Sequence, residues 1–501
     1  MKLPTRILNK IIYNNRHNRQ IIRRIVFGVF IMLFPSEVFI FLFLPIVVLV
    51  YYILLRNKQL AKNIFLLIVS LLFYAYGEPI YVFLMILVIV IHYFSGMLLK
   101  KHNHENSRKK AIVFVTVCID ILILGYFKYA NFIVDNINAI FHTNLPDINV
   151  ALPIGISFFT FQAISYVVDV YRDEEITQTN LLNIGLYISF FPQLIAGPII
   201  RYKTIAKEIN ERKETWKDFS LGINRFIIGL GKKVLLANQF GVVADAVFNG
   251  VGLDGNTNSV LFLWLGAISY TLQIFFDFAG YSDMAIGLGR MFGFHFDENF
   301  NYPYISKSIS EFWRRWHISL QTWFRDYVYI PLGGSRVKSK FRLVFNIFVV
   351  WFLTGLWHGA NWTFIIWGMM YFVLLVLERF WHIDQKLGKH NHLYVLFFVM
   401  IGWVFFRSES LSQALRYLAG MIGIGAQGFV DGGTIEYLQR YLIYYIAGIL
   451  CCFPYLKRAD KILSKNLVYN LIYIGGMVAI FLVSIMFIFS NAYNPFIYFN
   501  F

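Results

Sequence analysis

The segment from Leu343 to Leu377 reads LVFNIFVVWFLTGLWHGANWTFIIWGMMYFVLLVL and contains no Asp, Glu, Lys or Arg. As one helix these 35 residues would be about 52 Å long, whereas the hydrocarbon core of a bilayer is roughly 30 Å thick. The segment is too long for one crossing, and two straight crossings need about 40 apolar residues. We therefore expect two helices joined by a turn near Thr354 to Asn361, at or below the lipid headgroups.

The expected turn contains His358, the one side chain of the segment that can be charged near neutral pH. Irregular backbone at membrane depth is stable only when it is buried in protein or lines a water-filled cavity. An ionisable group in such a place is costly and usually functional. The sequence therefore marks His358 as a candidate catalytic residue.

The composition indicates that the whole chain lies in a bilayer. It is 58% hydrophobic and 19% aromatic, and only 15% of its residues are charged, too few to cover a water-soluble surface. We predict an all-α, polytopic membrane protein with about eleven transmembrane helices plus re-entrant and interfacial helices. The apolar runs are 38–55, 62–77, 79–98, 111–129, 151–170, 181–200, 220–237, 259–277, 343–353 with 362–377, 393–406, 440–455 and 468–490.

The formal net charge of +17 would suggest a nucleic-acid partner in a soluble chain. Here the basic residues cluster in short loops, 56–62 and 100–110, as expected for loops on the cytoplasmic side of a membrane. A hydrophobic hairpin turned at Gly77–Pro79 separates the two loops, so they share one side. We expect membrane lipids as partners and no nucleic acid.

Residues 1–31 form a basic N-terminal extension that conflicts with this orientation. The tail would lie outside if 38–55 crosses once, yet it carries seven Lys or Arg before residue 25. Either it draws the first apolar segment into an unusual arrangement, or it is an upstream extension and Met32 is the natural first residue. We predict one transmembrane domain over residues 32–501.

Two local motifs and the cysteines carry little functional weight. Cys118, Cys451 and Cys452 lie in apolar runs without metal-ligand spacing, so we predict no metal site and no bound cofactor. The G-x-G-x-x-G match at 423–428 has no surrounding βαβ pattern, so it does not predict a nucleotide-binding site. The His and Asp at 142 and 147 lie in a Pro-containing loop, so they do not predict a catalytic pair.

A second polar feature covers residues 308–324, SISEFWRRWHISLQTWF. Ser308 and Glu311 form a capping box, which predicts a helix starting near Ile309. If the segment forms one continuous helix, its residues divide between two faces. The apolar face contains Trp313, His317, Leu320 and Phe324, and the polar face contains Arg314, Gln321 and Arg325. This helix is expected at the membrane interface, with His317 facing apolar packing or a pocket.

The stretch 275–284, FFDFAGYSDM, predicts a break in a membrane helix at its Phe-Ala-Gly-Tyr-Ser core. Asp277 and Asp283 flank this core. Carboxylates at such depth either pair with a cation, here Arg314 or Arg290, or contact a substrate.

Several blocks together resemble the membrane-bound O-acyltransferases, within them the branch of alginate O-acetylation proteins. The blocks occur in the same order and cover nearly everything after Met32: 35–45, 73–79, 153–162, 191–198, 275–284, 311–317, 357–359 and 494–501. The resemblance implies a many-helix fold around a central tunnel on which two histidines, His358 and His317, converge. It also implies a place in the plasma (inner) membrane of a bacterium, and that an activated acyl group arrives from the cytoplasmic side.

Acyl transfer to a hydroxyl needs a base near neutral pKa, and imidazole fits this need best. We assign that role to His358, while His317 would orient the acceptor or the thioester, or share the proton. Asn361, Trp357 and Trp316 are candidate donors to the developing oxyanion, and Asp277 and Arg314 are candidate substrate contacts.

We expect an O-acetyltransferase that moves acetyl from acetyl-CoA across the membrane to an exported or cell-wall polysaccharide. The space between apolar runs is too small for a polymer-binding groove, and alginate-type systems use an exported, hydrolase-like acetyltransferase partner, so a similar partner is expected here. D-alanyl transfer to teichoic acids is the alternative reaction. A transporter or flippase is the alternative from another class, although no internal repeat supports it.

Overall fold

The computed structural model describes residues 32–148, 150–252, 255–256, 258–455, 462–463, 466–490 and 497. The expected extension 1–31 lies outside the described residues. The described residues fall into two compact units: unit 1 comprises those within 32–195 and 201–212, and unit 2 comprises those within 196–200 and 213–497. The domain boundaries expected from the sequence stay a prediction.

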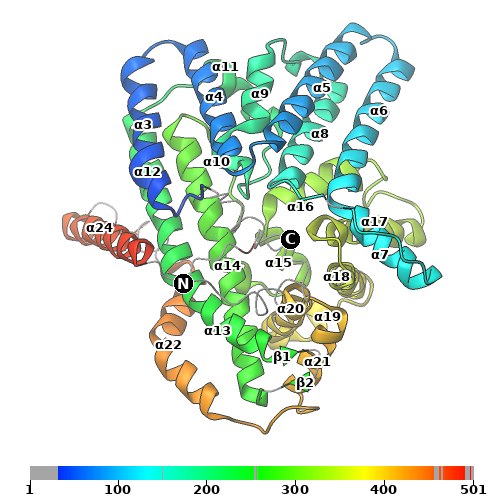
Figure 1. Ribbon diagram of the computed structural model, residues 1–501, viewed down its shortest axis with the longest axis vertical. Helices are drawn as coiled ribbons and strands as arrows, with labels where there is room; N and C mark the ends of the chain where they lie inside the picture. Colours follow the sequence, from blue (N-terminus) through cyan, green and yellow to red (C-terminus); the bar gives the residue numbers. More distant parts are fainter. Residues whose placement is uncertain are drawn as a thin grey trace. The chain divides into compact units, whose positions relative to one another are not determined.

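Unit 1 is a set of helices connected mostly by short turns (Figure 1). Its first helix joins α3 to a π-helical segment on each side, over Val38–Leu54. The helices are α3 Leu44–Leu49, α4 Gln59–Gly77, α5 Tyr81–Lys101, α6 Asn106–Leu124, α7 Ala130–Phe141, α8 Ile156–Arg172, α9 Leu181–Ser189, α10 Phe191–Leu194 and α11 Tyr202–Glu211.

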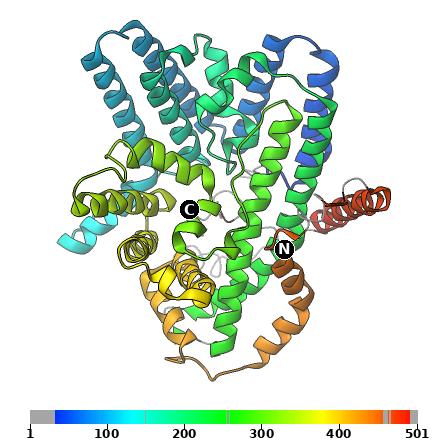
Figure 2. The same ribbon diagram turned by 180° about the vertical axis from the view of Figure 1, so that it is seen from behind.

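The basic loops of unit 1 lie at one end of it, as predicted. The α3–α4 loop, the α5–α6 loop and helix α11 all occupy the same end in Figures 1 and 2. The turn between α4 and α5 lies at the opposite end. The hairpin that separates the two basic loops therefore returns the chain to the side from which it started. That this side faces the cytoplasm stays a prediction from its positive charge.

Unit 2 contains the remaining helices, best followed from behind in Figure 2. A small antiparallel hairpin pairs β1 Val251–Gly252 with β2 Gly255–Asn256. The helices are α12 Trp216–Gly231, α13 Asn238–Asn249, α14 Val260–Met291, α15 Ile309–Arg315, α16 Ile318–Phe324, α17 Lys340–His358, α18 Trp362–Trp381, α19 Ile383–Lys386, α20 Asn391–Arg407, α21 Leu411–Met421, α22 Gly432–Cys451 and α24 Leu467–Phe489.

Helix α14 is continuous over 32 residues, so the break expected at the Phe-Ala-Gly-Tyr-Ser core is wrong. The small residues serve close packing instead. A Cβ atom on Gly280 would lie 2.8 Å from the carbonyl oxygen of Gly229 on α12, and one on Gly229 would lie 2.5 Å from that of Gly280. The two backbones approach at these glycines, and the helix needs no break there.

Helices α17 and α18 form the hairpin predicted for the charge-free segment. α17 ends at His358, α18 begins at Trp362, and the turn falls within the expected interval. Gly355 and Gly368 permit the helices to pack closely, because a Cβ on either would lie 2.5–2.6 Å from a backbone oxygen of the facing helix. The segment is therefore two packed helices with an imidazole at the joint.

Eight helices among the described residues are long and apolar enough to cross a membrane. The fold class is confirmed as an all-α, polytopic membrane protein, and the described residues contain no strand beyond β1 and β2. The estimate of about eleven crossings is not confirmed. The run 181–200, for example, contains the nine-residue α9 and the four-residue α10, both buried in unit 1.

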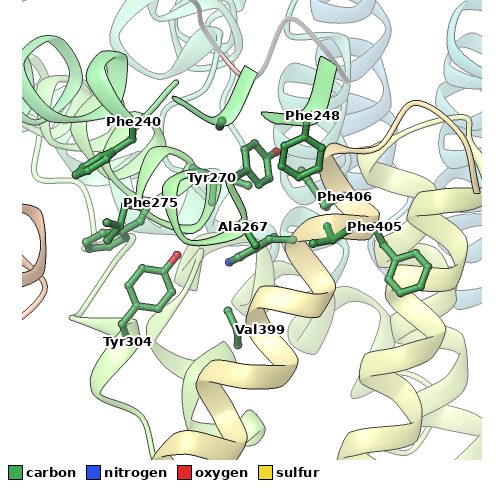
Figure 3. Close-up of a cluster of buried hydrophobic side chains, with 14 of the residues drawn as sticks. Phe240, Phe248, Ala267, Tyr270, Phe275, Tyr304, Val399, Phe405 and Phe406 are labelled. Atoms are coloured by element: carbon green, nitrogen blue, oxygen red, sulfur yellow. The ribbon is translucent and has the colours of Figure 1, made fainter. Parts of the chain in front are cut away.

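A large aromatic core fills unit 2. Figure 3 shows Tyr270 and Phe275 of α14 together with Phe240 of α13, Phe406 of α20 and Tyr304, which precedes α15. The Tyr304 hydroxyl donates to the carbonyl oxygen of Thr271 in α14 (2.5 Å). Burial of this many large rings anchors the non-helical segments that lead to α15.

Candidate active site

The α17–α18 turn positions His358 inside unit 2. The side chain is buried, and its ring lies 4.9 Å from Trp357, 5.0 Å from Trp367 and 4.9 Å from Phe406, measured between ring centroids. Phe406 comes from the core drawn in Figure 3. The imidazole at the joint is thus enclosed by aromatic rings.

Asn361 closes the turn that follows His358. Its Oδ1 accepts from the backbone N–H of Thr363 (3.1 Å), which caps α18, and its Nδ2 donates to the carbonyl oxygen of Glu409 (2.9 Å). Both ends of the amide are engaged within the protein. The arrangement explains Asn361 as a structural cap and gives no support to its predicted oxyanion role.

The helix predicted over residues 309–324 is broken in two, so its expected continuity is wrong. Glu311 N–H donates to the Ser308 side chain (2.9 Å), which confirms the predicted start. α15 then ends at Arg315 and α16 begins at Ile318. His317 lies in the break with φ 46°, a left-handed conformation that is unfavourable for a residue with a side chain.

Backbone pairing with a preceding loop explains the break. Asn301 N–H donates to the Arg315 carbonyl oxygen (2.9 Å), and Ile318 N–H donates to the Asn299 carbonyl oxygen (3.0 Å). These bonds replace helical bonds between α15 and α16. The two faces predicted for this segment are kept despite the break. The apolar face is buried and contains Trp313, His317, Leu320 and Phe324, and the polar face is exposed and contains Arg314, Gln321 and Arg325.

His317 is buried and held through one ring nitrogen. Its Nδ1 lies 3.2 Å from Asn299 Oδ1 and 3.4 Å from the Ser319 hydroxyl. Its Nε2 is buried with no hydrogen-bond partner among the described residues. The ring packs edge-on against Phe278 at 4.6 Å between centroids. Burial lowers the pKa of the His317 imidazole to about 3, so the ring is neutral near pH 7.

One indole connects the two predicted histidines. The Trp357 ring lies 5.8 Å from the His317 ring and 4.9 Å from the His358 ring, between centroids. All three residues belong to unit 2. The structure thus brings together His317, Trp357 and His358, while their chemical roles stay predictions.

Trp316 belongs to the aromatic core. Its ring contacts Phe275 (6.1 Å), Phe312 (5.6 Å) and Trp403 (4.8 Å). These contacts explain the residue by packing.

Asp277 forms a buried ion pair, but with a different cation from those expected. Its Oδ1 lies 2.7 Å from Lys233 Nζ, and its Oδ2 accepts from the Ile497 backbone N–H (2.9 Å). The predicted pairing with Arg314 or Arg290 is wrong, because Arg314 is exposed and Arg290 contacts Asp218. Lys233 lies within the apolar run 220–237 and far from Asp277 in sequence, so the sequence did not indicate this pairing.

Asp283 completes the correction. Its two carboxylate oxygens contact Arg225 (2.6 Å) and Lys232 (2.6 Å), both from the α12 region. The carboxylates that flank the Gly280 contact thus tie α14 to the adjoining helix.

The loop containing 423–428 has a structural role in unit 2. The carbonyl oxygens of Gly428 and Phe429 accept from the N–H groups of Val260 (3.1 Å) and Leu261 (3.0 Å) at the start of α14. The glycines thus supply a loop that caps α14. Among the described residues, no group of three or more His, Cys, Asp or Glu could hold a metal ion.

Three functional candidates were missed from the sequence: Asn299, Ser282 and Ser319. They form a buried network around His317, in which Asn299 Nδ2 donates to Ser282 Oγ (3.0 Å). Ser282 and Ser319 lie in quoted blocks or beside them, but serine is common in membrane helices. Asn299 lies in a polar stretch with several similar residues, so no spacing signal distinguished it.

Comparison with known proteins identifies the family to which the chain is similar. The membrane-bound O-acyltransferase family model matches residues 66–406. The chain is 45% identical over 402 residues to the probable alginate O-acetylase AlgI of Pseudomonas putida, covering 79% of this chain and 81% of that protein.

Two further relatives differ in the reaction that their names describe. The peptidoglycan O-acetyltransferase of Helicobacter pylori is 34% identical over 532 aligned positions, covering 95% of this chain and 99% of that protein. The teichoic acid D-alanyltransferase of Bacillus subtilis is 34% identical over 254 residues, which cover 49% of this chain and 63% of that protein. From the extent of the family match and of these similarities, we conclude that the chain is an acyltransferase that belongs to the membrane-bound O-acyltransferase family.

Proposed function

We propose that this protein moves an acetyl group from cytoplasmic acetyl-CoA across the membrane for O-acetylation of an exported or cell-wall polysaccharide. The observation that carries the proposal is the contact of two buried imidazoles, His317 and His358, with the same indole, Trp357. A pair of imidazoles in an apolar enclosure suits proton transfer during attack of a hydroxyl on a thioester.

The proposed reaction is a direct displacement at the thioester. The hydroxyl oxygen forms a bond to the carbonyl carbon, the carbon–sulfur bond breaks, and the products are an ester and a thiol. His358 takes the proton of the attacking hydroxyl and returns it to the leaving thiolate. The buried Nε2 of His317 is a second polar atom that could contact the reacting groups.

The acetyl group is favoured over D-alanine by the extent of similarity. The relatives named for O-acetylation match over 79–95% of this chain, whereas the teichoic acid D-alanyltransferases match over 46–49%. D-alanyl transfer is retained as the second candidate reaction. The transporter alternative is set aside, because the chain belongs to an acyltransferase family.

We further propose that an exported hydrolase-like protein receives the acetyl group and passes it to the polymer. The polar stretches between helices are loop-sized in both units, which supports a separate protein for polymer binding. Such a protein would offer a serine hydroxyl as the first acceptor.

The test is reconstitution of the full-length protein in liposomes. Labelled acetyl-CoA is supplied on the side of the basic loops, and peptidoglycan or alginate fragments are supplied on the other side, with and without the candidate partner. We expect label on the polymer only when both proteins are present. Efficient labelling by this chain alone would refute the relay, and transfer only from a D-alanyl donor would replace acetate by D-alanine.

A further inference from the structure

Asn299 connects three segments of unit 2 through its side chain. Oδ1 accepts from the Ser319 backbone N–H (3.2 Å) and from the Ser319 hydroxyl (2.9 Å), and it lies 3.2 Å from His317 Nδ1. Nδ2 donates to Ser282 Oγ in α14 (3.0 Å). The side chain is fully buried, so these contacts are not shared with bulk water.

The contacts fix which end of the amide faces His317. The backbone N–H of Ser319 can only donate, so the Asn299 atom opposite it must be the oxygen. The reversed amide would place an NH₂ group against that N–H and leave both donors without an acceptor. His317 Nδ1 therefore faces a carbonyl oxygen.

A carbonyl oxygen opposite Nδ1 in turn fixes the tautomer of His317. If Nδ1 were unprotonated, two acceptors would face each other at 3.2 Å. The Ser319 hydroxyl does not relieve this conflict, because its proton has a shorter path to Asn299 (2.9 Å) than to Nδ1 (3.4 Å). Its oxygen already accepts from the Ile199 N–H (3.0 Å). The neutral ring therefore carries its proton on Nδ1, and Nε2 presents a lone pair.

The Nε2 atom, which carries this lone pair, is buried and has no hydrogen-bond partner among the described residues. An unsatisfied buried polar atom destabilises the folded protein, and a bound group that donates a hydrogen bond to it would offset this cost. Among the described residues, Phe278, Asn299, Ser319 and Trp357 contact the imidazole, and none of these four is charged. None of the four favours the doubly protonated ring.

We infer that Asn299 is a positioning residue that holds His317 as a hydrogen-bond acceptor, so that His317 Nε2 binds the acyl-accepting hydroxyl rather than the thioester carbonyl. A carbonyl needs a donor, and Nε2 in this tautomer has no proton to donate. A hydroxyl supplies the missing donor. The inference rests on the proposed function and selects one of the roles left open for His317.

The tautomer is measured by ¹⁵N NMR of the full-length, ¹⁵N-histidine-labelled protein in detergent at neutral pH, with the His317 signals assigned by their loss in His317→Gln. We expect a protonated Nδ1 and an unprotonated Nε2. In Asn299→Leu, which has similar volume and no acceptor, we expect a mixture of both tautomers. Protonated Nε2 in the unsubstituted protein would overturn the inference.

Activity provides the second readout, as acetyl transfer from acetyl-CoA to the acceptor. Asn299→Leu should lose about 10- to 100-fold in activity, the loss seen when the partner that orients a metal-ligating histidine is removed. Asn299→Asp keeps an acceptor at the same place and should retain most of the activity. Asn301→Ala is the matched control, because this nearby asparagine pairs through its backbone and its side chain is exposed.

The outcomes separate this inference from the proposed function. Equal activity of Asn299→Leu and Asn301→Ala would overturn the positioning role. The positioning role would also be overturned if Asn299→Asp and Asn299→Leu lost the same amount of activity while His317 Nδ1 stayed protonated in both variants. An unsubstituted protein that transfers no acetyl group would contradict the proposed function, while the NMR result would still report the tautomer.

Discussion

The two imidazoles of unit 2 contact the same indole but are held differently. His358 lies among three aromatic rings at the end of α17, whereas His317 is tied through Nδ1 to Asn299 in a backbone break. A shared indole keeps both rings within one small volume. Removal of either imidazole should therefore affect the reaction more than the fold.

His358→Ala should abolish acyl transfer while the protein still accumulates in the membrane. Loss of a general base typically lowers the rate by about 10²- to 10⁴-fold. The measurement is the acetate content of the cell-surface polymer, with immunoblotting of membranes as the control for protein level. Near-normal acetylation at a normal protein level would exclude His358 as the base.

His317→Ala should also be severely impaired, whereas His142→Ala and His295→Ala should not. His317 is buried against Trp357. His142 is an exposed residue after α7, and His295 is 48% exposed and 3.5 Å from Asp218. The same acetylation assay compares the variants at matched protein levels. Equal losses in all three would mean that burial beside Trp357 does not mark the active histidines.

The sequence singled out the two histidines that the structure brings together, but not the residues that hold them. His358 was singled out because it lies in a long segment without charged residues. His317 was singled out by its place on an apolar helix face together with the family resemblance. Asn299 and Ser282 act through contacts between segments distant in sequence, which neither periodicity nor spacing encodes. Asp277 is a buried carboxylate in an apolar run, as a functional residue could be, yet it forms an ion pair with Lys233. Buried charges are found in structural ion pairs as well as in active sites.

At the scale of helices, apolar length was a better guide than local breaking residues. The charge-free segment had to turn because it exceeds one crossing, and α17 and α18 turn where expected. Gly280 suggested a break, but it serves helix packing in an unbroken α14. Periodicity could not reveal the break at His317, since two short helices in register preserve the same apolar face.

Gly355→Val should destabilise the α17–α18 hairpin. Its Cβ would lie 2.6 Å from the Phe364 carbonyl oxygen, and backbone cannot move away as a side chain can. Overpacking of this kind costs about 1–3 kcal/mol, which should lower the melting temperature of the purified protein in detergent. The matched control is Gly476→Val in α24, where a Cβ meets nothing within 4 Å. An equal effect of both substitutions would show that close packing at Gly355 is unimportant.

At the scale of the whole molecule, deletion of residues 1–31 should leave acyl transfer largely intact. The blocks that resemble the family begin just after Met32, and the tail has no apolar run long enough to cross a bilayer. The measurement compares acetylation and membrane level of the shortened and full-length chains. Disappearance of folded protein on truncation would show that the tail is needed for assembly.

The basic end of unit 1 has a consequence for the choice of lipid in any assay. Each Lys or Arg near a membrane surface is attracted to anionic headgroups by about 1 kcal/mol. The end of α5 carries Lys100 and Lys101, and the start of α6 carries Arg108, Lys109 and Lys110. Phosphatidylglycerol or cardiolipin should gather around this end, and vesicles of zwitterionic lipid alone would lack that annulus. The direction in which the protein inserts, and hence the fraction of molecules that face the supplied thioester, should depend on the anionic content of the vesicles.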